Sequence, residues 1–312
     1  MKTAFLFPGQ GAQVLGMGKD IYEQYQEAKE IYIKAEKISG IDIRKICFYG
    51  PEEELMKTEN TQIAILTTSL AILKVLECNG IKADIAVGLS LGEYVSLIYG
   101  GYMSFEDGIK LVKKRGYYMA NFLPKEEEYS MSAIIGLESN KIEKICNQIK
   151  KEGDFVVPVN YNCSSQTVIS GTDTAINIAI EKLKEAGAKR AIKLKTGGPF
   201  HTEKLKKASE LFSNELENVQ FKTGNGIKVI KNIDGKFYTK SDNFKEVLSK
   251  HIVNPVRFDK AIQVMKEQNI DRFIEIGPGK TLTGFIKKDY PEAELFNVNN
   301  LDSLKLIINK GD

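Results

Sequence analysis

The sequence predicts an α/β fold in which a small ferredoxin-like domain is inserted into a larger domain. Short apolar runs alternate with amphipathic helical segments along most of the 312 residues, and this alternation is typical of α/β proteins. The charged residues 125–128 mark a change in the pattern, and the elements predicted after them follow the ferredoxin-like order β-α-β-β-α-β. We therefore predict a large domain at residues 1–125 and 196–312 and an inserted domain at residues 126–195.

The large domain is predicted to begin with a buried strand at residues 3–7, which Pro8 and Gly9 end. Ser104 has the residue type of a helix N-cap and precedes an amphipathic segment. The other elements predicted for this domain are helices at 61–78, from 93 onward and at 105–122, and strands at 85–87 and 272–276. For the inserted domain we predict strands at 132–136, 156–161, 167–170 and 191–194, and helices at 141–151 and 174–186.

The composition argues against several classes of function. With 44 basic and 41 acidic residues the net charge is +3, and Lys and Arg are interleaved with Glu, so we expect no nucleic-acid binding. No stretch approaches the length of a membrane span, and the apolar run at the N-terminus is too short for a signal peptide, so we expect no membrane association. Four cysteines without a CxxC pair, beside only two histidines, argue against a metal site or disulfides and favour the cytoplasm.

Residues 88–92, Gly-Leu-Ser-Leu-Gly, match the G-x-S-x-G pattern of nucleophilic serines. A strand is predicted before the pattern and a helix after it, so Ser90 would lie on a tight turn whose flanking positions must be small. The helix N-terminus behind it would bring N–H donors and a positive partial charge to a developing oxyanion. The alternative interpretation is a glycine-rich βα turn with an exposed serine that does no chemistry.

A serine hydroxyl needs a base at neutral pH, and the chain offers only His201 and His251. His201 follows Gly198-Pro199-Phe200 in a turn before a predicted helix, a setting that can hold an imidazole at the mouth of a site. Taken alone, such a histidine is more often structural, but the scarcity of histidines favours His201 as the base. His251 lies near a helix end, where it could serve as a C-terminal cap.

Gly9-Gln10-Gly11 follows the first predicted strand. The two glycines would let the Gln10 backbone approach a ligand closely, and its N–H together with that of Leu91 would form a two-donor oxyanion hole. A turn that needs a positive φ angle is an equally good explanation of these glycines.

Several motifs, taken together and in order, resemble the malonyl-CoA:acyl carrier protein transacylases of fatty-acid and polyketide synthesis. The similarity covers essentially the whole chain, which makes it more specific than any single motif. The motifs are 7–11 (FPGQG), 61–62 (TQ), 88–94 (GLSLGEY), 114–116 (KRG), 159–162 (VNYN), 166–171 (QTVISG), 198–201 (GPFH), 254–258 (NPVRF) and 275–280 (EIGPGK).

The resemblance implies an α/β-hydrolase-like large domain with a ferredoxin-like insertion. It implies that Ser90 is acylated, that His201 is its base, and that a backbone carbonyl at His251 orients that base. Arg115 would bind the free carboxylate of malonyl, as a guanidinium can with two parallel hydrogen bonds, although Arg115 could also be one more basic residue on its helix. Phe200 would fill the space of a 2-methyl group. Further substrate-binding residues by the same resemblance are Gln62, Asn160 and Met119.

Three positions depart from the usual family pattern. Leu89 replaces the histidine that many members have before the nucleophile, so no base is expected there. His251 replaces a common glutamine, but a carbonyl orients the base whatever its side chain is. Ile63 replaces a frequent proline.

The implied partners are malonyl-CoA and an acyl carrier protein, with the coenzyme A thioester as substrate and no permanently bound cofactor. Lys189 and Arg190 could contact an acidic carrier, and standalone members of the family usually act as monomers. A serine hydrolase using the same Ser90 and His201, and a non-catalytic carrier-docking protein with the same fold, are the two competing hypotheses.

Overall fold

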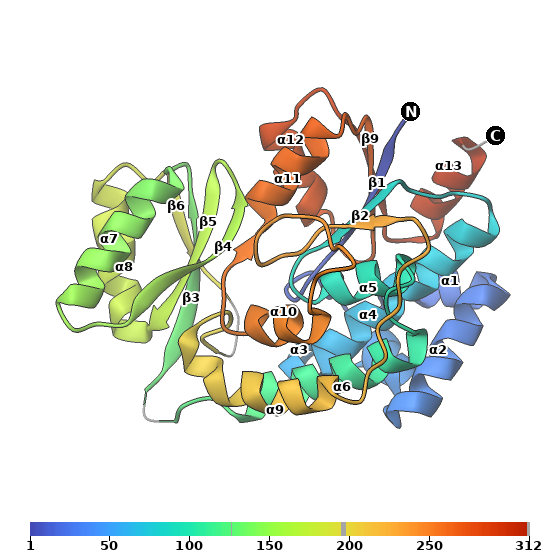
Figure 1. Ribbon diagram of the computed structural model, residues 1–312, viewed down its shortest axis with the longest axis horizontal. Coiled ribbons are helices and arrows are strands. Elements are labelled where there is room, and N and C mark those ends of the chain that lie inside the picture. The colour runs from blue at the N-terminus through green and yellow to red at the C-terminus, as the bar shows by residue number, and fades with distance from the viewer. Residues whose placement is uncertain (126, 195–197, 311–312) are drawn as a thin grey trace.

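The computed structural model describes residues 1–125, 127–194 and 198–310 and places them in a mixed α/β fold with two five-stranded sheets (Figure 1). The first sheet has the order β10-β9-β1-β2-β7 and all its strands are parallel. The second has the order β6-β3-β5-β4-β8. The predicted fold class, a large α/β domain with a smaller ferredoxin-like unit, is confirmed. The predicted limits of the inserted domain at Glu126 and Lys195 lie outside the described residues.

The elements follow in chain order. They are β1 (Thr3–Phe7), α1 (Lys19–Gln24), α2 (Gln26–Ser39), the π-helical turn η1 (Lys45–Tyr49), α3 (Glu52–Met56), α4 (Thr58–Cys78), β2 (Ile85–Gly88), α5 (Gly92–Tyr99), α6 (Phe105–Asn121), β3 (Tyr129–Ile135), α7 (Ser139–Lys151), β4 (Val156–Cys163), β5 (Gln166–Thr172), α8 (Asp173–Glu185), β6 (Arg190–Lys193), the 3₁₀ turn η2 (Glu203–Leu205), α9 (Lys206–Leu216), β7 (Lys228–Val229), α10 (Phe244–His251), β8 (Val256–Arg257), α11 (Phe258–Glu267), β9 (Arg272–Ile276), α12 (Thr281–Asp289), β10 (Glu294–Val298) and α13 (Leu301–Lys310). Every strand and helix predicted from the sequence is present, with ends that shift by a few residues.

Strand β1 shows why the first sheet is buried on both faces. Its five residues are all buried, and their side chains alternate between two cores: Phe5 and Phe7 pack into the larger core, Ala4 and Leu6 into the other. Successive side chains of a strand point to opposite faces, and a parallel sheet is normally covered by helices on both sides. Helices α4, α5 and α6 supply the larger core, and α11 and α12 supply the other.

The second sheet has its own core beneath α7 and α8, on the outer side of the molecule in Figure 1. Strands β3, β4, β5 and β6 pair antiparallel, but the two-residue strand β8 joins the same sheet from a segment about one hundred residues further along the chain and pairs parallel with β4. The inserted unit is therefore completed by a piece of the later chain. No sequence periodicity can show a strand of two residues, and this one was not predicted.

Helix α4 corrects one sequence-based expectation. It has 21 residues, and an 18-residue window within it has a mean hydropathy of 1.4. This is long and apolar enough to span a membrane, so the expectation that no stretch approaches that length was wrong. In the structure 83% of that window is buried inside the protein. The physical reason is that a helix surrounded by other helices and a sheet is apolar on every side.

Candidate active site

Ser90 lies on the turn between β2 and α5, with a φ angle of 54°. This left-handed conformation is costly for a residue with a Cβ and persists only where the surroundings enforce it. Both flanking glycines are required by space: a Cβ on Gly88 would lie 1.9 Å from the Gly92 carbonyl carbon, and a Cβ on Gly92 would lie 2.1 Å from the Phe7 carbonyl oxygen. The turn therefore has the tight strand-to-helix geometry that the G-x-S-x-G pattern predicted.

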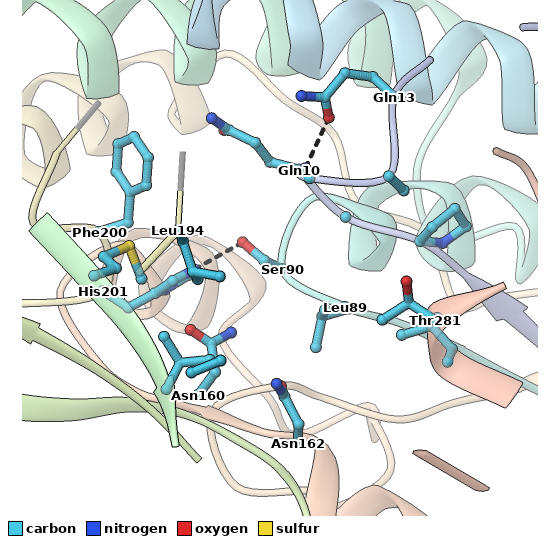
Figure 2. Close-up of a pocket in the computed structure, with 18 of the residues that line it drawn as sticks. Gln10, Gln13, Leu89, Ser90, Asn160, Asn162, Leu194, Phe200, His201 and Thr281 are labelled. Atoms are coloured by element: carbon cyan, nitrogen blue, oxygen red, sulfur yellow. Dashed lines mark hydrogen bonds between the residues drawn. The ribbon is translucent and has the colours of Figure 1, made fainter. Parts of the chain in front are cut away.

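The predicted proximity of Ser90 and His201 is present, as the dashed line in Figure 2 shows. Ser90 Oγ lies 2.7 Å from His201 Nε2, and His201 Nδ1 lies 2.9 Å from the His251 carbonyl oxygen. Because a carbonyl can only accept, Nδ1 carries the proton and Nε2 is left to accept one from the serine hydroxyl. The His251 carbonyl thus sets the tautomer in which His201 can act as a base.

The surroundings of His201 favour its neutral form. The imidazole is 4% exposed, and its pKa lies well below the ordinary value, first because burial disfavours the cation and then because of positive charge at His251 and Arg115. A neutral imidazole can accept a proton at neutral pH. The φ angle of His201 is also positive, at 60°, so both members of the pair are held in conformations that most residues avoid.

Arg115 on α6 is buried, with 1% exposure, and points at the serine. One guanidinium nitrogen donates to Ser90 Oγ at 3.0 Å and another to Gln62 Oε1 at 2.7 Å. Nε has no partner, and within the described ranges no carboxylate lies within 4 Å of the guanidinium. Burial lowers the pKa of Arg115. Tyr94 and Glu93 nearby raise it, but by less than burial lowers it. A buried cation with spare donors and no carboxylate of the described residues within 4 Å is suited to an anionic ligand.

These groups face a cavity of about 370 Å³ between the two sheets (Figure 2). The large domain contributes Ser90, His201 and Arg115, and the second sheet contributes Asn160 and other side chains from β3, β4 and β5. The predicted substrate-binding residues Phe200, Gln62, Asn160 and Met119 all line the cavity. The full lining is Pro8, Gly9, Gln10, Gly11, Ala12, Gln13, Met56, Gln62, Leu89, Ser90, Arg115, Met119, Met131, Ala133, Asn160, Asn162, Gln166, Val168, Leu194, Phe200, His201, Thr281, Leu282 and Phe285.

The two backbone groups predicted for the oxyanion hole are free to bind a ligand. In the part of the chain that the structure describes, no protein group accepts a hydrogen bond from the N–H of Gln10 or of Leu91. The two loops touch, since a Cβ on Gly9 would lie 2.4 Å from the Leu89 carbonyl oxygen. The Ser90 N–H is already used, because it donates to Asn232 Oδ1 at 2.6 Å. The geometry therefore leaves the two predicted donors available.

Sequence reasoning missed three residues around the site. Asn232 bridges the serine turn, Glu93 is a fully buried carboxylate behind it, and Asn162 lines the cavity with an Oδ1 that has no partner among the described residues. Glu93 and Asn162 lie within quoted motifs, so their position was a usable signal. No sequence signal pointed to Asn232, because it lies in an irregular segment far from Ser90 in the chain.

The acyl transferase domain family matches this chain over residues 4–306. The fold and the site therefore belong to an acyltransferase, which sets the class of the molecule.

Curated relatives and solved structures refine this class. Malonyl CoA-acyl carrier protein transacylase of Bacillus subtilis (strain 168) is 39% identical over 307 residues, covering 98% of this chain and 96% of that protein. The crystal structure of the protein of that name from Clostridium perfringens is 42% identical with a TM-score of 0.94, covering 99% of this chain and 97% of that one. A type II PKS acyl-carrier protein in complex with its malonyl-transacylase gives a TM-score of 0.94 at 34% identity, covering 99% and 100%. The chain belongs to the malonyl CoA-acyl carrier protein transacylase family.

Proposed function

We propose that this chain transfers a malonyl group from malonyl-CoA to the phosphopantetheine thiol of an acyl carrier protein, through a malonyl ester on Ser90. The observation that carries the proposal is the convergence of two groups on one oxygen: His201 Nε2 lies 2.7 Å from Ser90 Oγ, and an Arg115 nitrogen lies 3.0 Å from it. The contact with His201 activates the serine as a nucleophile. The contact with Arg115 places a cation without a carboxylate partner in the described chain where a short acyl group on Ser90 would extend.

In the first half-reaction His201 Nε2 takes the proton of Ser90, and Ser90 Oγ attacks the thioester carbon. The oxyanion that forms accepts hydrogen bonds from the N–H groups of Gln10 and Leu91. The carbon–sulfur bond then breaks, the proton on His201 passes to the sulfur, and coenzyme A leaves. Base catalysis typically contributes about 10²–10⁴-fold and one oxyanion donor roughly 10²–10³-fold, so both are needed.

The second half-reaction runs the same steps in reverse order with the carrier thiol as nucleophile. His201 takes the thiol proton, the sulfur attacks the ester carbon, and Ser90 leaves with the proton returned to its oxygen. During both steps the malonyl carboxylate lies one methylene group beyond the ester carbonyl. Arg115 replaces its hydrogen bond to Ser90 Oγ with a two-point contact to that carboxylate, while Phe200 closes the space beside it.

Several relatives support the carrier protein as partner by their names. The free cysteines Cys47, Cys78, Cys146 and Cys163 support a reducing compartment such as the cytoplasm. We also propose that the protein acts as a monomer with no resident cofactor, which sedimentation of the purified chain and its activity after exhaustive dialysis would test.

The experiment that tests the function is intact-mass analysis after mixing with malonyl-CoA, with and without a phosphopantetheinylated carrier protein. We expect the mass of one malonyl group on the enzyme, mapped to Ser90, and its passage to the carrier. Ser90→Ala serves as the control and should acquire no label. Steady release of free malonate without a stable ester would show a hydrolase, and absence of labelling would show a non-catalytic protein.

A further inference from the structure

The helix that follows the nucleophile carries a buried carboxylate that the steps above do not use. Glu93 on α5 is 0% exposed and lies behind the serine turn, outside the described lining of the cavity. An ionised carboxylate is costly to bury unless other groups compensate its charge. The contacts of Glu93 lead to both members of the Ser90–His201 pair.

One chain of contacts runs from Glu93 to Ser90. Glu93 Oε1 accepts the backbone N–H of Asn232 at 3.1 Å. The Asn232 side chain then spans the turn: its Nδ2 donates to the Gly88 carbonyl at 2.7 Å, and its Oδ1 accepts the Ser90 N–H at 2.6 Å. Since Ser90 has a positive φ angle, it keeps this conformation only while such contacts persist. Glu93 therefore holds the residue that holds the nucleophile.

A second chain of contacts runs from Glu93 to His201. Glu93 Oε2 lies 3.1 Å from His251 Nδ1, a close electrostatic contact without the alignment of a hydrogen bond. The His251 ring lies 4.8 Å from the His201 ring, tilted by 31°, and the carbonyl of the same residue accepts the His201 Nδ1 proton. A shift of His251 would thus move both the ring beside the base and the carbonyl that orients it.

We propose that Glu93 is a positioning residue that anchors Ser90 through Asn232 and His201 through His251. The other titratable groups that face this carboxylate are Tyr238, whose hydroxyl donates to Oε1 at 2.8 Å, and Tyr94 and Arg115 nearby. The inference rests on the proposed function only in treating Ser90 and His201 as the reacting pair.

The test uses Glu93→Gln and the rate at which a fluorophosphonate probe labels Ser90. The probe reports the nucleophile and its base independently of any acyl donor. We expect labelling and malonyl transfer to slow by about 10- to 100-fold, with KM for malonyl-CoA nearly unchanged, since small misplacement of reacting groups has effects of up to about 100-fold. Glu36→Gln on α2 is the matched control: it makes the same charge change, and Glu36 also accepts a backbone N–H and pairs with Arg44, and neither residue lines the cavity.

A second variant, His251→Gln, keeps the carbonyl and removes the imidazole. Because this imidazole lies 3.1 Å from Glu93 Oε2 and its ring lies 4.8 Å from the His201 ring, its removal should slow the labelling of Ser90. In the double variant Glu93→Gln/His251→Gln the two reductions in labelling rate should be less than multiplicative, because both substitutions act along the same path of contacts.

Three results would overturn the inference: labelling of Glu93→Gln no slower than that of Glu36→Gln, fully multiplicative effects on the labelling rate, or labelling of His251→Gln as fast as that of the wild type. The last decides the matter if Glu93→Gln does not fold. If the wild type reacts with the probe but is never malonylated, the proposed function fails and the anchoring role remains.

Discussion

The two sheets contribute to the same cavity in different ways. The groups that touch the reacting oxygen, Ser90, His201 and Arg115, come from the large domain, and two of them stand on turns with positive φ angles. The second sheet contributes a wall of side chains from its strands, such as Asn160 and Asn162 on β4, where the pairing with β5 is locally irregular. The comparison teaches that two residues in the costly left-handed conformation lie where bonds are to be made and broken, while the second sheet shapes and closes the space.

The strongest test of this comparison is removal of the nucleophile. Ser90→Ala should lower malonyl transfer by about 10⁴-fold or more, because removing the nucleophile of such a site leaves only binding and the oxyanion donors. Transfer to the carrier protein, followed by intact mass, measures the loss. Substantial residual transfer through an acyl-enzyme would mean that another residue is acylated.

His201→Ala should lower the acylation rate by roughly 10²–10⁴-fold, the usual contribution of a general base. In the wild type the lowered pKa of His201 places its protonation below the ordinary value of 6.5. The rate should therefore stay level from neutral pH down past 6.5 and fall only in more acidic buffer. A fall centred at or above pH 6.5 would contradict the neutral, buried base.

Arg115→Ala should lower malonyl transfer by on the order of 100-fold, since it leaves the malonyl carboxylate buried without its cation. Acetyl-CoA lacks this carboxylate, so its use should fall much less. The ratio of kcat/KM values for the two thioesters measures the effect. Equal losses for both substrates would show that Arg115 supports Ser90 and does not recognise the acyl group.

Asn162→Ala, on the wall formed by the second sheet, should have the smallest effect. Loss of one uncharged hydrogen bond is typically worth about 0.5–1.5 kcal/mol, or roughly 2- to 10-fold. We expect this loss to appear as a higher KM, because Asn162 forms a hydrogen bond with neither Ser90 nor His201 in the structure. An effect on kcat as large as that of His201→Ala would contradict the idea that the second sheet shapes the cavity and takes no part in the reaction.

Much of the fold and of the site could be predicted from the sequence because the signals are local. A turn that requires glycine at positions 88 and 92, a short apolar strand at Thr3–Phe7 and the N-cap hydrogen bond at Ser104 each depend on a few neighbouring residues. Such features are encoded in short stretches of sequence. The order of the motifs along the chain then indicated the family.

Only the tertiary structure decided how distant segments meet. Ser90 and His201 are 111 residues apart in the chain, strand β8 joins a sheet built from much earlier residues, and Asn232 bridges the serine turn from an irregular segment. The same holds for Arg115, whose lack of a carboxylate partner in the described chain depends on everything that packs around α6. Local sequence determines where helices, strands and turns form, but the environment of a side chain is set by packing between segments that the sequence does not place side by side.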